Sequence, residues 1–118
     1  PVEGARRWAV LKAQALGDGI LDAALSLVME SRRPDAQQSE FWQARWISAI
    51  HRGVDDIADD VRADDAVFDL GRISYACALG YLDFRLPDLD WRAPHPGLAD
   101  WFSDMSGRES FALTAPPE

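Results

Sequence analysis

The chain has 118 residues, of which 47% are hydrophobic, and it carries a formal net charge of −8 at pH 7. This length fits a single domain, residues 1–118, and the hydrophobic content supports a packed core and excludes a disordered segment. The acidic balance argues against nucleic acid and anionic membrane surfaces as partners, because both attract basic proteins. No apolar run reaches the roughly 18 residues that a membrane-spanning helix needs.

The chain contains a single cysteine, Cys77, and therefore cannot form an intramolecular disulfide. The absence of disulfides suits a reducing compartment, so we expect a cytoplasmic protein. Cys77 lies in an apolar run with no basic neighbour, which predicts a buried and unreactive thiol. The two histidines, His51 and His95, show no ligand spacing with each other or with this thiol, so no metal site is expected.

Helical periodicity dominates the chain, and we predict helices over residues of about 3–33, 35–62, 70–86 and 95–106. In the first segment apolar residues recur every three or four positions, and Pro34 ends the helix. No segment shows the alternation of a strand. The predicted fold class is therefore all-α, a helical bundle with two long antiparallel helices, a buried central helix and shorter C-terminal helices.

Capping residues mark the starts of the second and third helices. Asp35 followed by Gln38 is a capping-box pattern, so we place the start of the second helix at Asp35. Asp69 is predicted to be the N-cap of the third helix. This third helix is apolar on nearly all sides, which is typical of a helix at the centre of a bundle.

An unusual segment of the first helix combines two carboxylates with two glycines. Asp18 and Asp22 interrupt a mostly apolar stretch and, being four residues apart, share one face of the helix, where like charges repel. Gly17 and Gly19 each cost about 1 kcal/mol relative to Ala in a helix interior. Such a loss of stability is expected where two backbones approach closely or where a ligand binds. The alternative is a solvent-facing stretch without a role.

Four stretches of the chain carry a resemblance to a known family. They are ALGDGILDAA at 15–24, SEFWQARW at 39–46, YACALGYLDFR at 75–85, and HPGLADWF at 95–102 followed by RESF at 108–111. Each stretch alone is a weak signal, but their order and spacing are specific. Over essentially its whole length the chain resembles the C-terminal all-helical domain of bacterial-type glutathione S-transferases.

The resemblance implies a larger enzyme with glutathione as co-substrate and no metal. An N-terminal thioredoxin-like domain of the same chain would bind glutathione and supply the Ser, Cys or Tyr that activates its thiol. The helical domain would form the wall of the electrophile site and much of a homodimer interface. The reaction would transfer the glutathione thiolate to a small electrophilic or disulfide substrate. The helical domain alone is expected to be inactive, because the thiol-activating residue is not on it.

The resemblance also implies roles for residues on one face of the first helix. Asp22 matches the position from which some members reach the γ-glutamyl amino group of glutathione across the dimer, and Asp18, one turn earlier, would assist it or hold an Arg. Leu25, Met29 and Arg32 follow on the same face and match the region that lines the electrophile pocket. For Leu25 and Met29, core packing is the alternative.

The chain departs from the family pattern at the start of the third helix. The family has Ser or Thr as N-cap with Asp three residues later, whereas this chain has Asp69 followed by Arg72. Arg72 lies near the positive end of the helix dipole, so we expect it to pair with Asp69 or with a carboxylate elsewhere.

An alternative function is a non-catalytic protein-interaction module of the same shape. A thioredoxin-like segment upstream would favour the enzyme over this module.

Overall fold

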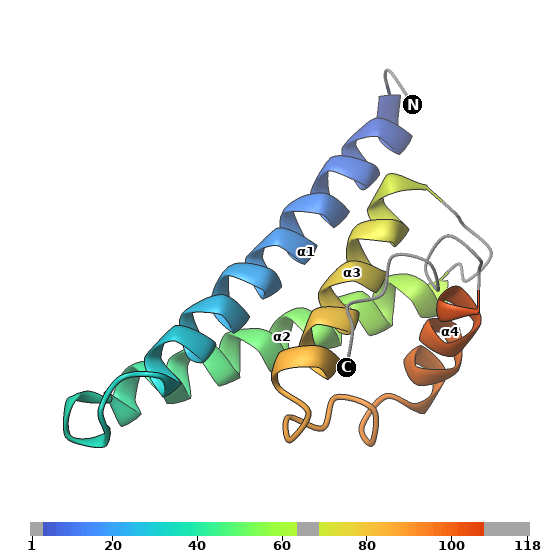
Figure 1. Ribbon diagram of the computed structural model, residues 1–118. Helices are drawn as coiled ribbons and strands as arrows, with labels where there is room; N and C mark the ends of the chain where they lie inside the picture. Colours follow the sequence, from blue (N-terminus) through green and yellow to red (C-terminus); the bar gives the residue numbers. More distant parts are fainter. Residues whose placement is uncertain (1–3, 64–68, 108–118) are drawn as a thin grey trace.

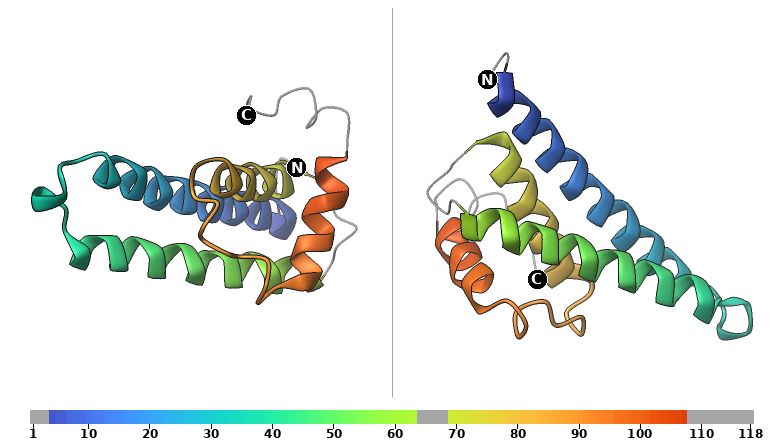
Figure 2. Two further views of the ribbon diagram at one scale, coloured as in Figure 1. Left: turned by 60° about the horizontal axis from the view of Figure 1, so that its bottom comes forward. Right: turned by 180° about the vertical axis from the view of Figure 1, so that it is seen from behind.

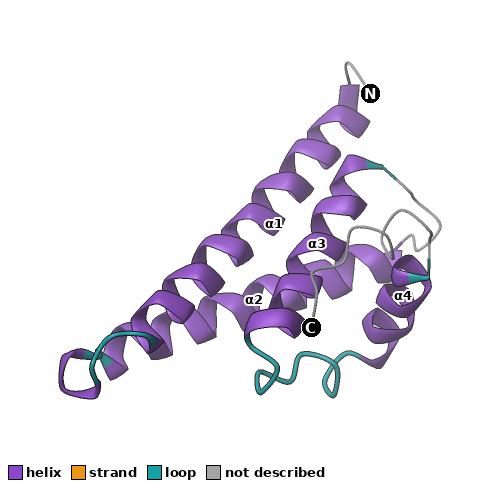
Figure 3. Ribbon diagram, viewed as in Figure 1, coloured by secondary structure: helices purple, strands orange, loops and turns teal. Residues whose placement is uncertain are grey.

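The computed structural model describes residues 4–63 and 69–107 of the chain. They form four α-helices and one short 3-10 turn (Figure 1), and Figure 3 shows no strand among these described residues. The elements in chain order are α1 (Gly4–Ser31), η1 (Asp35–Gln37), α2 (Glu40–Ala63), α3 (Leu70–Arg85) and α4 (Pro96–Ser106). The predicted all-α class is confirmed.

The two long helices, α1 and α2, form an antiparallel hairpin whose connection lies at one extreme of the molecule (Figure 1). α3 packs mainly against α1, and α4 packs against α2 and α3 at the end away from the hairpin connection (Figure 2). α3 and α4 therefore cover only part of the long hairpin formed by α1 and α2.

The core forms where the four helices face one another. Ile50 and Ile57 of α2 and Leu79 and Leu82 of α3 are fully buried, and Trp91 from the connection between α3 and α4 is 1% exposed. The burial of these large side chains provides most of the driving force for packing, at roughly 1.5–3 kcal/mol for each aliphatic side chain. α3 thus contributes one buried face to this core.

One side of α3 remains open, and this corrects the expectation for the single thiol. Cys77 is exposed, as are Leu70 and, less fully, Phe84. α3 is covered by α1 on one side and by α4 on another, and within the described residues nothing covers its third side. Partial desolvation by neighbouring atoms nevertheless raises the pKa of the Cys77 thiol, as expected for an unreactive cysteine.

The second long helix begins later than the capping-box pattern predicts. Residues 35–37 form a 3-10 turn, and α2 begins at Glu40 with the Ser39 hydroxyl accepting a hydrogen bond from the backbone N–H of Trp42 at 3.2 Å. The Gln38 amide donates to the Arg33 carbonyl at 2.8 Å instead of completing a capping box. Glu30 strengthens the turn, because its carboxylate accepts from the backbone N–H of Ser39 at 3.0 Å.

Asp69 occupies the N-cap position of α3. Its side chain accepts a hydrogen bond from the backbone N–H of Arg72 at 3.0 Å. The Arg72 side chain reaches α2, where its guanidinium lies 3.3 Å from the Asp60 carboxylate and donates to the Asp60 carbonyl at 3.2 Å. Pairing with a carboxylate elsewhere offsets the unfavourable position of this cation near the helix N-terminus.

Candidate functional site

The residues predicted to bind glutathione and substrate lie along one exposed face of α1. Asp18, Asp22, Leu25, Met29 and Arg32 are separated by alternating steps of four and three residues, and all are exposed. Leu25 is 51% exposed and Met29 is 54% exposed, so neither is a core residue of this domain. The structure therefore brings the predicted residues together on a surface, with two carboxylates followed by an apolar pair.

The two carboxylates are available to an outside ligand. Within the described ranges, neither Asp18 nor Asp22 forms a hydrogen bond or an ion pair. α1 runs through this segment as one continuous helix, from Gly4 to Ser31, so the carboxylates are held one turn apart. In residues 4–63 and 69–107 no group of three or more potential metal ligands is placed to hold an ion. An ammonium group is a partner of suitable charge for the pair.

The two glycines beside these carboxylates have different environments. A Cβ atom built at Gly17 would lie 3.0 Å from the carbonyl oxygen of Ser74, which places Gly17 at a close contact between α1 and α3. A Cβ atom at Gly19 would meet nothing within 4 Å. Close backbone approach explains Gly17, whereas Gly19 lies on open surface.

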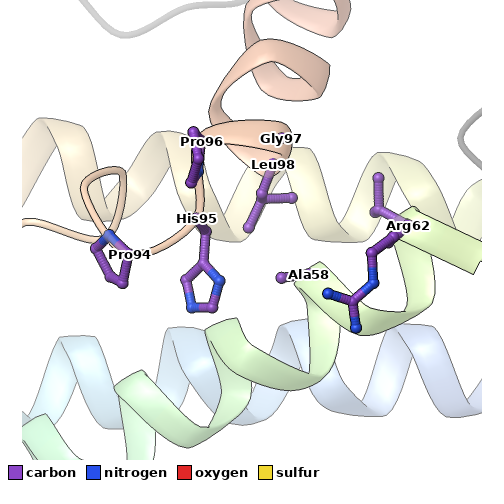
Figure 4. A pocket seen from close by; sticks show the side chains of 8 residues that line it. Ala58, Arg62, Pro94, His95, Pro96, Gly97 and Leu98 are labelled. Carbon is purple, nitrogen blue, oxygen red and sulfur yellow. The ribbon is translucent and has the colours of Figure 1, made fainter.

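None of three cavities formed by the described residues is lined by the predicted site residues. A cleft of about 640 Å³ lies between α1, α2 and α3, and Lys12 of α1 and Asp56 of α2 are among the residues that line it. A pocket of about 520 Å³ lies between the hairpin and the loop after α3. A third, of about 380 Å³, lies between α2 and the start of α4, and Figure 4 shows the His95 ring directed at α2 across it.

A polar network between α2 and α3 went undetected in the sequence. The Tyr75 hydroxyl donates to the Asp60 carboxylate at 2.5 Å, and Arg72 binds the same carboxylate. Burial, followed by the hydrogen bond to Asp60, raises the pKa of the Tyr75 hydroxyl well above its usual range. Asp60 lies 12 residues from Arg72 and 15 residues from Tyr75 along the chain, so no local pattern indicates these contacts.

A second network holds the long connection between α3 and α4. The Asp83 carboxylate accepts from the indole N–H of Trp91 at 3.0 Å and from both terminal nitrogens of Arg92, at 2.6 and 2.7 Å. The Arg92 guanidinium also lies 4.4 Å from the centre of the Trp91 ring. At the end of the connection, His95 Nε2 lies 2.7 Å from the Asp55 carboxylate of α2. These contacts fix the position of α4, so they are structural.

The family assignment rests on a match over more than half of the chain. Residues 40–104 match the family model described as the C-terminal domain of glutathione S-transferases. The chain belongs to the glutathione S-transferase family. The matched residues run from the first residue of α2 into α4, so they include both networks that hold the bundle together.

Individual relatives agree with this assignment. The chain is 41% identical to the uncharacterized GST-like protein YibF of Escherichia coli (strain K12), over all of this chain and 58% of that protein. It is 41% identical to a glutathione transferase family member from Pseudomonas fluorescens Pf-5, crystallised with bound glutathione, with a TM-score of 0.96 over all of this chain and 58% of that one. A glutathione S-transferase from Methylobacterium radiotolerans, in complex with glutathione sulfonate, is 35% identical, with a TM-score of 0.92 over all of this chain and 57% of that one.

The glutathione S-transferase domain seen here spans less than two thirds of the length of these relatives. Its four helices correspond to the all-helical part of the longer chains. No helix within the described ranges is both long and apolar enough to cross a membrane.

Proposed function

We propose that this chain is the C-terminal domain of a cytoplasmic glutathione S-transferase that transfers the glutathione thiolate to small electrophilic or disulfide substrates. The observation that carries the proposal is the exposed Asp18–Asp22 pair, two carboxylates without a cation partner among the described residues. The pair lies on a domain 41% identical to a relative that was crystallised with glutathione.

The carboxylate pair suits the amino end of glutathione. The γ-glutamyl group of this tripeptide carries an ammonium, and an ammonium–carboxylate contact is about twice as strong as a hydrogen bond between neutral groups. Asp22 would accept from this ammonium, and Asp18, one turn earlier, would add a second negative charge. In this proposal the carboxylates bind and orient glutathione without taking part in proton transfer.

The apolar residues on the same face would form one wall of the electrophile site. Leu25 and Met29 lie one and two turns beyond Asp22 and are half exposed, as expected for side chains that a partner surface or substrate covers. Arg32 would lie at the edge of this wall. During transfer the glutathione thiol loses its proton, its sulfur bonds to the electrophilic atom of the substrate, and the leaving group departs with its bonding electrons.

The thiol-activating residue would come from an N-terminal thioredoxin-like domain of the same chain. The open sides of α1 and α3 support a partner of this kind, because Trp8, Leu70 and Cys77 are exposed there. Such a set of exposed apolar side chains on one domain is typical of an interface. We also propose a homodimer, in which α1 of one subunit faces the glutathione of the other.

The test is steady-state kinetics of the full-length protein with Asp22→Asn, using 1-chloro-2,4-dinitrobenzene and glutathione. We expect the KM for glutathione to rise about tenfold, the effect of losing a hydrogen bond to a charged group, with a much smaller change in kcat. Asp104→Asn is the matched control, because Asp104 is an exposed residue of α4 far along the chain from the site. An unchanged KM in the Asp22 variant would remove this residue from the glutathione site.

The same experiment separates the enzyme from the interaction module. A full-length protein that neither turns over this substrate nor binds glutathione in isothermal titration calorimetry would support a non-catalytic role. The isolated domain is expected to show no transferase activity in either case. Activity therefore has to be measured on the longer protein.

A further inference from the structure

A pocket that the proposed transferase site does not use lies on another side of α1. It has a volume of about 520 Å³ and lies between α1, α2 and the connection that follows α3. Figure 2 (left) shows this connection leaving α3 and running toward α2 and the start of α4. Leu27 of α1 lines the pocket, whereas Leu25 and Met29 belong to the proposed electrophile wall. Two residues turn an α-helix by about 200°, so Leu27 points away from that wall.

Hydrogen bonds fix the connection that forms one wall of this pocket. The backbone N–H of Leu89 donates to the Leu86 carbonyl at 3.0 Å. The Asp90 carboxylate accepts from the backbone N–H of Arg92 at 3.1 Å, and the Arg92 side chain binds Asp83 at the end of α3. A wall held in this way is already ordered before a ligand arrives, which lowers the entropic cost of binding.

The lining of the pocket is largely apolar. Leu27 is only 9% exposed, and Ile47 of α2 is 38% exposed. Leu86 and Leu89 of the connection are partly buried against the core. The volume lies within the range of about 300–1,000 Å³ that is typical of small-molecule sites, which are also mostly apolar with a few polar groups. A ligand for this pocket therefore needs an apolar part.

Two side chains of the pocket offer hydrogen-bond donors to an anion. The guanidinium of Arg85, the last residue of α3, lies 4.1 Å from the centre of the Phe84 ring. Stacking on a ring uses the face of a guanidinium and leaves its edge free to bind a carboxylate through two N–H groups. His51 of α2 offers a further ring nitrogen. Within the described ranges, neither Arg85 nor His51 forms a hydrogen bond or an ion pair.

The same pocket carries a carboxylate that is available to a cation. Asp88 is exposed and forms no hydrogen bond or ion pair among residues 4–63 and 69–107, whereas backbone N–H groups occupy the Asp90 carboxylate. Asp88 lies three residues beyond the end of α3, and the C-terminal end of a helix dipole also favours a positive charge. An ammonium group suits these surroundings.

We infer that this pocket binds a small zwitterion, an α-amino acid with an apolar side chain. The ligand carboxylate accepts from Arg85 and His51, and the ligand ammonium donates to Asp88. The apolar side chain of the ligand lies against Leu27 and Ile47. Inorganic phosphate is a poorer match, because it has no apolar part and Asp88 repels it. This site is additional to the proposed transferase site and does not depend on it.

The first test is isothermal titration calorimetry of the full-length protein with L-leucine. L-Leucinamide lacks the carboxylate, 4-methylpentanoic acid lacks the ammonium, and glycine lacks the apolar side chain. We expect each analogue to bind at least about tenfold more weakly than L-leucine, because each leaves one part of the pocket without its partner. An analogue that binds as tightly as L-leucine, or a protein that takes up no L-leucine at millimolar concentration, would overturn the inference.

Variants then locate the bound amino acid. Arg85→Met and Asp88→Asn should each raise the dissociation constant of L-leucine about tenfold. Arg85→Met should leave the affinity for L-leucinamide unchanged, since this analogue has no carboxylate for Arg85 to bind. Asp104→Asn on α4 is the matched control for Asp88→Asn and should bind L-leucine like the wild type. Urea unfolding of each variant shows whether a lost affinity reflects a misfolded protein.

Asp22→Asn distinguishes this pocket from the proposed glutathione site. It should leave the affinity for L-leucine unchanged, because Asp22 does not line the pocket. Binding of L-leucine that Asp22→Asn weakens and Arg85→Met does not would place the amino acid in the glutathione site and overturn the inference. Calorimetry with L-leucine needs no turnover, so a protein without transferase activity can still confirm the pocket. A pocket that binds no amino acid leaves the kinetic test of Asp22 intact.

Discussion

Gly17 of α1 lies against the backbone of Ser74 in α3, so closely that a Cβ atom at Gly17 would be 3.0 Å from the Ser74 carbonyl oxygen and 3.2 Å from its carbonyl carbon. The contact joins two backbones, and neither can yield as a flexible side chain could. It sets how near α1 and α3 approach, and therefore where the exposed face of α1 lies relative to the rest of the bundle.

Substitution by Ala is expected to have opposite effects on stability at Gly17 and at Gly19 of α1. Gly19→Ala should raise the free energy of unfolding by about 1 kcal/mol, because Ala favours the helix and its Cβ would enter open space. Gly17→Ala gains the same propensity but must separate two packed backbones, which costs about 1–3 kcal/mol, so its net effect is destabilising. Urea unfolding of both variants measures the difference, and equal shifts would contradict the packing explanation.

The sequence predicts the helices well because their signals are local. Pro34, the periodic apolar residues and the Asp69 cap act within one or two turns, and α1, α3 and α4 lie close to their predicted ranges. The start of α2 differs from its predicted position because Ser39 and Asp35 are both good caps, and the choice depends on Glu30 from the preceding helix. Contacts across the bundle, such as Arg72 with Asp60, leave no local pattern.

The candidate site was only partly predictable for the same reason. The spacing of Asp18 and Asp22 places them on one face, but whether that face is core or surface depends on where α2 and α3 pack. Apolar periodicity also cannot distinguish a core residue from an interface residue, and Met29 proves to be exposed.

The contribution of the Glu30 carboxylate to the stability of the protein is expected to be lost in acid. Its carboxylate is buried and accepts from the Ser39 backbone N–H and from Arg33, which hold its pKa below the ordinary value. A lowered pKa in the folded state contributes stability above the unfolded-state pKa, and this contribution disappears as the pH falls through the folded-state pKa. Glu30→Gln should therefore be less stable than the wild type at pH 7, with the difference shrinking below about pH 4. Urea unfolding at pH 7 and below pH 4 measures the difference in stability between the wild type and Glu30→Gln. A difference that stays constant would contradict the charge-based explanation.

In the connection before α4, removing the Asp83 carboxylate is expected to lower stability more than removing the Arg92 side chain. Asp83→Ala would leave the indole N–H of the buried Trp91 without its acceptor, at a cost of about 1–3 kcal/mol. Arg92→Ala would remove the ion pair but leave that hydrogen bond in place. Because the Arg92 side chain is 47% exposed, its ion pair is worth only about 0–1 kcal/mol. Chemical unfolding of both variants should rank Asp83→Ala as the more damaging, and the reverse order would show that stacking of Arg92 on Trp91 dominates.

The contribution of the Tyr75 hydroxyl to the stability of the protein is expected to be lost in base. Burial and the hydrogen bond to Asp60 raise the pKa of its hydroxyl, so the folded protein keeps this proton at a pH where the unfolded chain releases it. Stability from this group is complete below the unfolded-state pKa of about 10 and falls as the pH rises above it, by at most about 1.4 kcal/mol per pH unit. Tyr75→Phe loses one hydrogen bond, so at pH 7 it should be about 1 kcal/mol less stable than the wild type. Above pH 10 the wild type should lose this advantage, and urea unfolding between pH 7 and 11 should show the two curves converging. Parallel curves would mean that Tyr75 ionises alike in the folded and unfolded chains, which would contradict the buried hydrogen bond.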